Sequence, residues 1–192
     1  MNTIFCYIYP DMADFEVTIL LHRLRNAGGR RILCIAEDMQ PVTSQSGLRY
    51  LPDLPIADAQ AEAAEALIIP GGPIDPHRNA ILPLLRAMHG QGKLIAAICF
   101  GPQFAARAGL LAGRRYATSC TPQMLAAQGL DDPFPRATQV DRRVVRDGNL
   151  ITAQGHALVD FAQEVCRYLR VYPTPRQEYN ELGKLKESED TP

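Results

Sequence analysis

The stretch IAAICFGPQFAARAGLL, residues 95–111, decides the fold because it joins a buried strand to a helix through a sharp turn. Four apolar residues lead into Cys99, Gly101-Pro102 interrupts the strand, and a helical pattern follows. A thiol at this point lies at a helix N-terminus, where free backbone N–H groups and the helix dipole favour a thiolate. The arrangement is that of a nucleophile elbow with sulfur in place of oxygen. The alternative is that Cys99 is a small apolar core residue, as free cysteines usually are.

Buried strands alternate with helical segments on both sides of this stretch. Strands are predicted at 3–9, 31–36, 66–69, 93–98, 115–119, 139–146 and 149–153, a small hairpin at 40–51, and helices at 15–27, 81–88, 101–111 and 156–171. This alternation predicts an α/β fold whose mostly parallel sheet is covered by helices on both faces. In such sheets, ligands bind at the carboxyl ends of the strands.

Length and composition predict one domain over residues 1–171, because 192 residues suffice for one full core. Residues 172–192 are proline-bearing and then charged, and we interpret them as a partly ordered C-terminal arm with a disordered end. The net charge of -1 gives no basic footprint, so no nucleic-acid partner is expected. No apolar run approaches the roughly 18 residues of a membrane span, so no membrane partner is expected either.

The N-terminus lacks the basic residues and the long apolar segment of a signal peptide. The five cysteines are odd in number, widely scattered and free of CxxC spacing. This pattern argues against a disulfide framework and a zinc site, and it predicts a reducing cytoplasmic location. We therefore expect no metal and no cofactor.

Two further segments place polar groups near the same edge of the predicted sheet. Gly71 and Gly72 follow the strand at 66–69, where backbone N–H groups can point into a cleft and bind an oxyanion, although Pro-Gly-Gly is also an ordinary turn. Glu16 lies in the first turn of the first helix, among apolar neighbours. It could be a helix-dipole partner, or an inward-facing carboxyl whose pKa is raised by burial and which shares a proton with Cys99.

These pieces, in this order, resemble the ThiJ/PfpI superfamily, whose fold is related to class I glutamine amidotransferases. The matching residues are Tyr9-Pro10 with Phe15-Glu16, IIPGG at 68–72, AAICFGP at 96–102, DGNLITAQG at 147–155, and Asp160-Phe161. The resemblance covers about residues 3–170 and implies a flavodoxin-like three-layer sandwich that forms a homodimer. It also implies that Cys99 is the reactive or oxidation-sensitive thiol, Glu16 its hydrogen-bond partner, and Gly72 part of an oxyanion pocket. Gly71, Phe100 and Gly155 are assigned to the same pocket.

The sequence departs from this family where a histidine is usual. Phe100 directly follows the cysteine, and residues 118–121 (TSCT), about twenty positions on, also contain no histidine. Peptidase activity is therefore doubtful. His156 follows Gly155 and is a candidate general base, or alternatively a helix cap or a dimer contact. Cys120 is either a resolving thiol for an oxidised Cys99 or a packed cysteine.

Two functions follow from these residues. In the first, Cys99 attacks a small amide, a nitrile-like group or a reactive carbonyl, Glu16 handles the proton, and the N–H groups near Gly72 and Phe100 stabilise the developing charge. In the second, the protein is a non-enzymatic oxidative-stress sensor or protective protein, in which Cys99 oxidises to a sulfinate held by Glu16 and the helix N-terminus. A thiol sensor needs no general base, so the missing histidines favour the second function.

Overall fold

A seven-stranded, mostly parallel sheet forms the centre of the molecule in the computed structural model, which describes residues 2–186. The strand order is β5-β2-β1-β6-β7-β9-β8, and the last pair, β9 and β8, is antiparallel. The strands are β1 (Thr3–Tyr7), β2 (Arg31–Ala36), β5 (Leu54–Pro55), β6 (Ala66–Ile69), β7 (Leu94–Ile98), β8 (Val144–Asp147) and β9 (Leu150–Ala153). In the middle of the sheet, β6 and β7 consist of fully buried Ala, Leu and Ile, which is typical of a parallel sheet covered on both faces.

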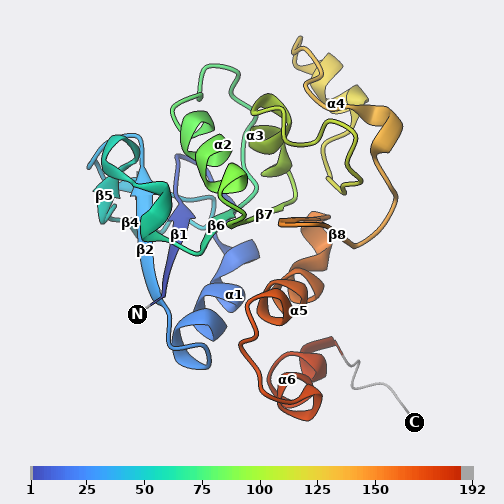
Figure 1. Ribbon diagram of the computed structural model, residues 1–192. Helices are drawn as coiled ribbons and strands as arrows, with labels where there is room; N and C mark the ends of the chain where they lie inside the picture. Colours follow the sequence, from blue (N-terminus) through green and yellow to red (C-terminus); the bar gives the residue numbers. More distant parts are fainter. Residues whose placement is uncertain (1, 187–192) are drawn as a thin grey trace.

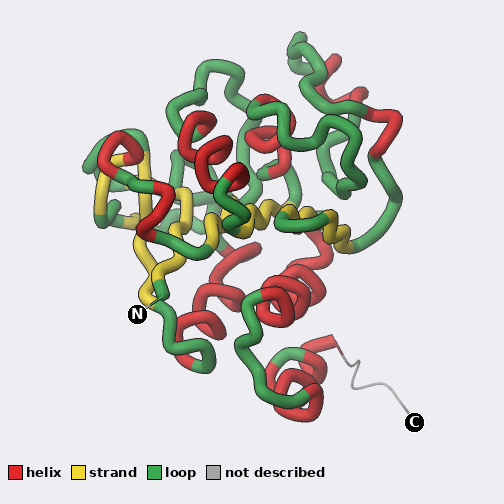
Figure 2. The backbone as a smooth tube through the Cα atoms, in the orientation of Figure 1, coloured by secondary structure: helices red, strands yellow, loops and turns green. Residues whose placement is uncertain are grey.

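Helices cover both faces of this sheet (Figure 1). The pair α1 (Phe15–Asn26) and α5 (Leu158–Tyr168) packs together on one face, and α2 (Leu82–Gly90) with α3 (Pro102–Arg107) lies on the other. Figure 2 shows the strands as one layer between these two layers of helices. The predicted flavodoxin-like three-layer sandwich is therefore confirmed.

The shorter elements lie outside this sandwich. A hairpin of β3 (Val42–Thr43) and β4 (Arg49–Tyr50) confirms the one predicted at 40–51. Two further helices follow later in the chain, α4 (Pro122–Ala127) and α6 (Pro175–Glu181). The 3₁₀ turns are η1 (Ile56–Asp58), η2 (Ala61–Ala63), η3 (Arg136–Thr138), η4 (Gly155–Ala157) and η5 (Gly183–Lys186). No helix among the described residues is long and apolar enough to cross a membrane.

Several predicted elements are shorter than expected. The helix predicted at 101–111 ends at Arg107, because Gly109 takes a φ of 79° that turns the chain out of the helix. The strand predicted at 115–119 is wrong, since that segment contributes only an isolated bridge between Tyr116 and Gln139. The strand predicted at 139–146 begins only at Val144.

The C-terminal arm is ordered beyond what its composition indicates. Thr174 caps α6 by accepting a hydrogen bond from the Gln177 amide, and Pro175 occupies the first turn, where a proline is tolerated. Ion pairs join this helix to the sandwich, between Arg23 and Glu181 and between Arg167 and Glu178. The end predicted to be disordered lies in part outside the described residues, which stop at 186.

Candidate active site

Cys99 occupies a sharp turn between β7 and α3, as the sequence predicts. Its backbone has a φ of 61°, a left-handed conformation that a non-glycine residue rarely adopts. The Cys99 amide donates to the Ala153 carbonyl at 2.8 Å, which fixes the turn against the end of β9. A Cβ at Gly101 would lie 2.7 Å from the carbonyl oxygens of Ile69 and Pro70, so this position requires glycine. The strained conformation therefore presents the thiol beyond the carboxyl end of the sheet.

Glu16, from the first turn of α1, meets this thiol. The carboxyl is only 3% exposed, and its Oε2 accepts a hydrogen bond of 2.7 Å from the Gly71 amide. Its other partner is the Cys99 thiol. Burial raises the pKa of Glu16, and the hydrogen bonds from Cys99 and Gly71 oppose this shift only in part. The structure thus brings together the two residues that the sequence could only place on separate elements.

The resting thiol is protonated rather than ionised. Burial, then the negative charge of Glu16 and the hydrogen bond to it, raise the pKa of Cys99 to about 12. The backbone N–H of Phe100 and the Ser119 side chain lower it, but by less. Burial, and after it the charge of Glu16, thus outweigh the donors at the helix N-terminus, so the surroundings of Cys99 disfavour the resting thiolate that the turn alone predicts.

Gly71 and Gly155 enclose this pair closely. A Cβ at Gly71 would lie 2.6 Å from Glu16 Oε2 and 2.8 Å from Cys99 Cβ. A Cβ at Gly155 would lie 2.8 Å from Cys99 Sγ and 3.1 Å from Glu16 Oε1. Gly72 has a φ of 153°, and a Cβ there would collide with the Tyr9 ring. The absence of side chains at these glycines is what lets the carboxyl and the thiol approach each other.

Ser119 is part of the site, although the sequence analysis did not select it. Its amide donates to the Cys99 carbonyl at 3.0 Å, and its hydroxyl hydrogen-bonds to the Cys99 thiol. The same hydroxyl accepts from the Gly155 amide at 2.8 Å and donates to Gln154 Oε1 at 3.1 Å. The available signal was its position twenty residues after Cys99, where related proteins place a histidine.

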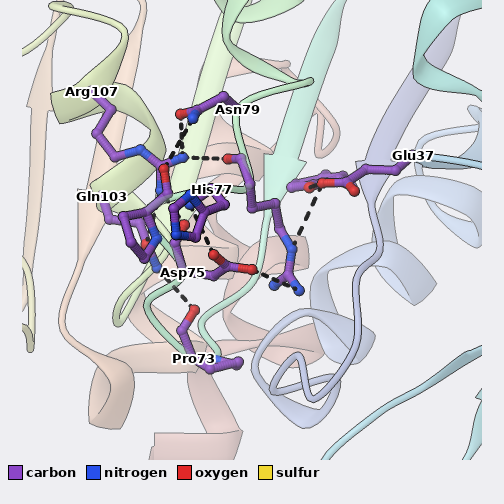
Figure 3. Close-up of polar contacts among 10 residues, drawn as sticks. Glu37, Pro73, Asp75, His77, Asn79, Gln103 and Arg107 are labelled. Carbon is purple, nitrogen blue, oxygen red and sulfur yellow. Dashed lines mark hydrogen bonds and ion pairs between the residues drawn. The ribbon is translucent and has the colours of Figure 1, made fainter. Parts of the chain in front are cut away.

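Side chains of α3 fasten the loop that carries the site glycines (Figure 3). Gln103 Nε2 donates to the Pro73 carbonyl at 3.3 Å. Arg107 donates to the Asp75 carbonyl at 2.8 Å, to Asn79 Oδ1 at 2.6 Å and to the Arg78 carbonyl. Since α3 begins directly after Cys99, one short helix positions both the thiol and the loop after β6.

The remaining predicted residues lie around this centre with different outcomes. Phe100 is half-buried and contributes its backbone N–H to the Cys99 sulfur. The His156 side chain is exposed, and no hydrogen bond joins it to Cys99 or Glu16 in the described part of the chain. Cys120 is fully buried, and burial raises the pKa of its thiol. The general base therefore has one candidate in contact with the thiol, Glu16.

Among the described residues, no metal site coincides with the thiol, and the cavity next to the loop after β6 does not reach it. Within residues 2–186, no group of three or more His, Cys, Asp or Glu side chains could hold a metal ion. A cavity of about 520 Å³ lies between the loop after β6 and residues 129–133, and Cys99 is not among its lining residues. The groups available for a reaction at this site are therefore a thiol, a carboxyl and backbone N–H groups.

An α/β sandwich with a cysteine at a strained strand–helix turn and a buried carboxyl beside it defines the class of protein that the sequence resembles. The DJ-1/PfpI family model matches residues 2–168, so the chain belongs to the DJ-1/PfpI family. This match confirms the resemblance to the ThiJ/PfpI superfamily.

Named relatives in this family differ in activity. The chain is 28% identical over 167 residues to protein dj-1beta of Drosophila melanogaster, covering 83% of this chain and 85% of that protein. It is 30% identical over 150 residues to a deglycase of Pyrococcus horikoshii (75% and 84%). It is 28% identical over 166 residues to isonitrile hydratase of Pseudomonas putida (84% and 69%).

Solved structures agree with the fold. A DJ-1 superfamily protein from Agrobacterium tumefaciens superposes with a TM-score of 0.80 at 26% identity, over 94% of this chain and 96% of that one. Oxidized DJ-1 of Toxoplasma gondii superposes with a TM-score of 0.75 at 24% identity, over 96% and 98%. The second likeness concerns the fold alone.

Proposed function

We propose that this protein is a cysteine-dependent enzyme of the hydrolase or hydratase type, acting on a small amide, a nitrile-like group or a reactive carbonyl. The observation that carries the proposal is the hydrogen-bonded pair of Glu16 and Cys99. A carboxyl whose pKa is raised is a stronger base than an ordinary one, so it can take the thiol proton as the reaction begins. Relatives named deglycase and isonitrile hydratase support a small electrophile as substrate.

The proposed step conserves atoms and charge. As the Cys99 sulfur forms a bond to the electrophilic carbon, its proton moves to Glu16, and the electron pair of the carbon–heteroatom π bond moves to the oxygen or nitrogen. The backbone N–H groups of Gly72 and Phe100 donate to that atom. Glu16 then returns the proton to the same atom or to the leaving group. An amide or a nitrile gives in this way a thioester or a thioimidate, which water attacks to release the product and the free thiol. A 2-oxoaldehyde gives a hemithioacetal instead. Transfer of the hydrogen on its sulfur-bearing carbon to the neighbouring carbonyl carbon oxidises the first carbon and reduces the second, and water then hydrolyses the thioester that results.

The test compares turnover in the wild type with Cys99→Ala and Glu16→Ala on small amides, nitriles, isonitriles and 2-oxoaldehydes. Both variants are expected to lose turnover, while Cys34→Ala, a half-buried cysteine on β2, keeps it. Iodoacetamide alkylation followed by peptide mass spectrometry then shows whether Cys99 reacts ahead of the other thiols. Turnover that survives in Cys99→Ala contradicts the proposal. No turnover on any substrate, with a discrete sulfinate on Cys99 after mild peroxide, supports the sensor function instead.

A homodimer in the cytoplasm completes the proposal. Large apolar side chains are exposed on α1 and on the hairpin: Phe15 on α1 is 51% exposed, and Leu48 and Leu51, which flank β4, are 58% and 72% exposed. Hydrogen bonds from Ser46 and Tyr50 to Asp14 hold the hairpin against the start of α1, which favours an apolar interface at this end of the helix. Light scattering after size exclusion is expected to give twice the mass of 21.2 kDa, and Phe15→Glu is expected to give the monomer mass. A wild type that elutes as a monomer contradicts the dimer.

A further inference from the structure

The Ser119 hydroxyl has two hydrogen-bond acceptors beside it but only one proton to donate. Its hydroxyl accepts from the Gly155 amide at 2.8 Å, so its own proton must point elsewhere. Two acceptors compete for that proton, Gln154 Oε1 at 3.1 Å and the sulfur of Cys99. One hydroxyl can serve only one of them strongly at a time.

The backbone around Ser119 holds the hydroxyl in this position. The Ser119 amide and the Thr118 hydroxyl both donate to the Cys99 carbonyl, at 3.0 and 2.7 Å, and the Ala117 amide donates to Thr152 Oγ1 at 2.9 Å. Residues 117–119 are therefore fastened to the ends of β7 and β9. Because the chain is fixed, rotation of the hydroxyl about its C–O bond is the motion that remains available.

We propose that the Ser119 hydroxyl is a switchable donor, whose proton turns from Gln154 Oε1 to the Cys99 sulfur when the thiol proton passes to Glu16. The inference rests on the proposed function and assigns a role to a residue outside the thiol–carboxyl pair. In the resting state, a neutral thiol is a weak acceptor, so the amide oxygen of Gln154 holds the hydroxyl proton. Once the sulfur is negative, it becomes the stronger acceptor, because hydrogen bonds to ionised groups are roughly twice as strong.

The switch fits the charges around the sulfur. Glu16 from α1 and Tyr9 after β1 are the titratable groups that act on Cys99, and neither offers a positive charge. The thiolate is therefore stabilised by neutral donors, namely the Phe100 amide and the Ser119 hydroxyl. In the resting state, the amide oxygen of Gln154 accepts the proton of the Ser119 hydroxyl, so this hydroxyl does not donate to the neutral thiol.

The pH profile of Cys99 alkylation by iodoacetamide tests the switch through two variants that act in opposite directions. Ser119→Ala removes the donor, so we expect the pKa of Cys99 to rise and its alkylation at neutral pH to slow about tenfold. Ser119→Thr keeps the hydroxyl and is expected to restore the wild-type profile. Gln154→Leu removes the competing acceptor, so the pKa of Cys99 is expected to fall and alkylation to accelerate by up to about tenfold.

Two results overturn the switch. Either Ser119→Ala leaves the profile unchanged, or Gln154→Leu shifts the profile in the same direction as Ser119→Ala. Gln154 is only half-buried, so its variant keeps the test available even where Ser119→Ala lowers stability. Failure of the proposed function is recognised separately, as the absence of turnover or as turnover that survives in Cys99→Ala or Glu16→Ala. Turnover that depends on both residues, with alkylation profiles that stay unchanged in the Ser119 and Gln154 variants, overturns the switch alone.

Discussion

Asp14 and Glu16 stand two residues apart at the start of α1, and both are nearly fully buried, at 2% and 3% exposure. Burial raises the pKa of Asp14, but hydrogen bonds, chiefly from Ser46 and Tyr50, outweigh it, so the pKa falls below its usual value. Burial also raises the pKa of Glu16, and there the donors do not outweigh it. Two carboxyls of similarly small exposure thus have opposite pKa shifts, because Glu16 lies deeper in the protein and loses more of its hydration, whereas hydroxyl donors outweigh the smaller loss at Asp14.

The difference separates a structural carboxylate from a chemical one. Asp14 stays charged and joins the hairpin to α1 through hydrogen bonds of 2.8 Å from Ser46 and from Tyr50. In the function proposed above, Glu16 accepts a proton from Cys99. Where two carboxyls titrate apart, the one with the raised pKa is the acid–base group.

Glu16→Gln is expected to have the largest effect of the variants, and this effect is on turnover. The amide cannot accept the thiol proton, so turnover is expected to fall about 10²–10⁴-fold. A raised pKa means that folding favours the protonated carboxyl, and this contribution is lost as pH rises through that pKa. A neutral Gln is therefore expected to leave the free energy of unfolding at neutral pH unchanged or higher, as urea titration measures. Retained turnover, or a large fall in the free energy of unfolding, would contradict the distinction between a structural Asp14 and a chemical Glu16.

Gly155→Ala separates the thiol from the carboxyl without touching Asp14. The added Cβ would lie 2.8 Å from Cys99 Sγ, so the pair must shift, and turnover is expected to fall about 100-fold. Gly90→Ala is the matched control, since a Cβ there meets nothing within 4 Å and the backbone is helical. Equal kinetic constants for the two variants would contradict the conclusion that the contact of Glu16 with Cys99 requires a glycine at position 155.

Asp14→Asn is expected to lower stability and to leave the chemistry of Cys99 unchanged, which is the reverse of the result expected for Glu16→Gln. The variant weakens the hydrogen bonds from Ser46 and Tyr50 and is expected to cost about 1–3 kcal/mol of stability at pH 7. Because the folded-state pKa is lowered, this stabilisation is present above the ordinary value of 3.8 and is lost as pH falls below it. Denaturant titrations from pH 7 down to pH 3 should therefore show the wild type approaching the variant. The Cys99 alkylation profile should stay as it is, and a shifted profile would link the two carboxyls.

The smallest effect is expected from Tyr50→Phe. It deletes one donor to Asp14 and is expected to cost about 0.5–1.5 kcal/mol, with Ser46 still in place. Thermal unfolding measures the loss, and turnover is expected to be unchanged. A cost equal to that of Asp14→Asn would mean that Tyr50 alone carries the structural role.

The sheet and the elbow were predictable because they depend on local pattern. Continuous apolar runs mark β6 and β7, and the sequence from Cys99 to Pro102 combines a strand end, a glycine and a helix start. Asp14 was not singled out, because its donors lie more than thirty residues away on the hairpin. Sequence spacing carries no information about which distant hydroxyls face a buried carboxyl.

Ser119 and the raised pKa of Cys99 escaped prediction for a related reason, although the raised pKa of Glu16 was predicted. The segment around Ser119 has the β-branched and aromatic composition of a strand, yet its one bridge, between Tyr116 and Gln139, lies outside the named strands. Its hydrogen bonds to the turn at Cys99 and to the end of β9 are tertiary contacts. The pKa of Cys99 likewise depends on a carboxyl from the first helix, and the dipole argument for a thiolate considered only the turn itself.

The left-handed backbone at Cys99 presents the thiol but lowers the stability of the fold, so selection for heat resistance and selection for thiol chemistry favour different residues at this position. Glycine adopts this conformation freely, whereas a side chain there costs of order 1–3 kcal/mol. A library screened only for heat resistance would therefore be enriched in glycine at position 99, and one screened for thiol chemistry would retain the cysteine. The ratio of survivors under the two selections would measure how much folding energy this protein gives up to expose one sulfur atom.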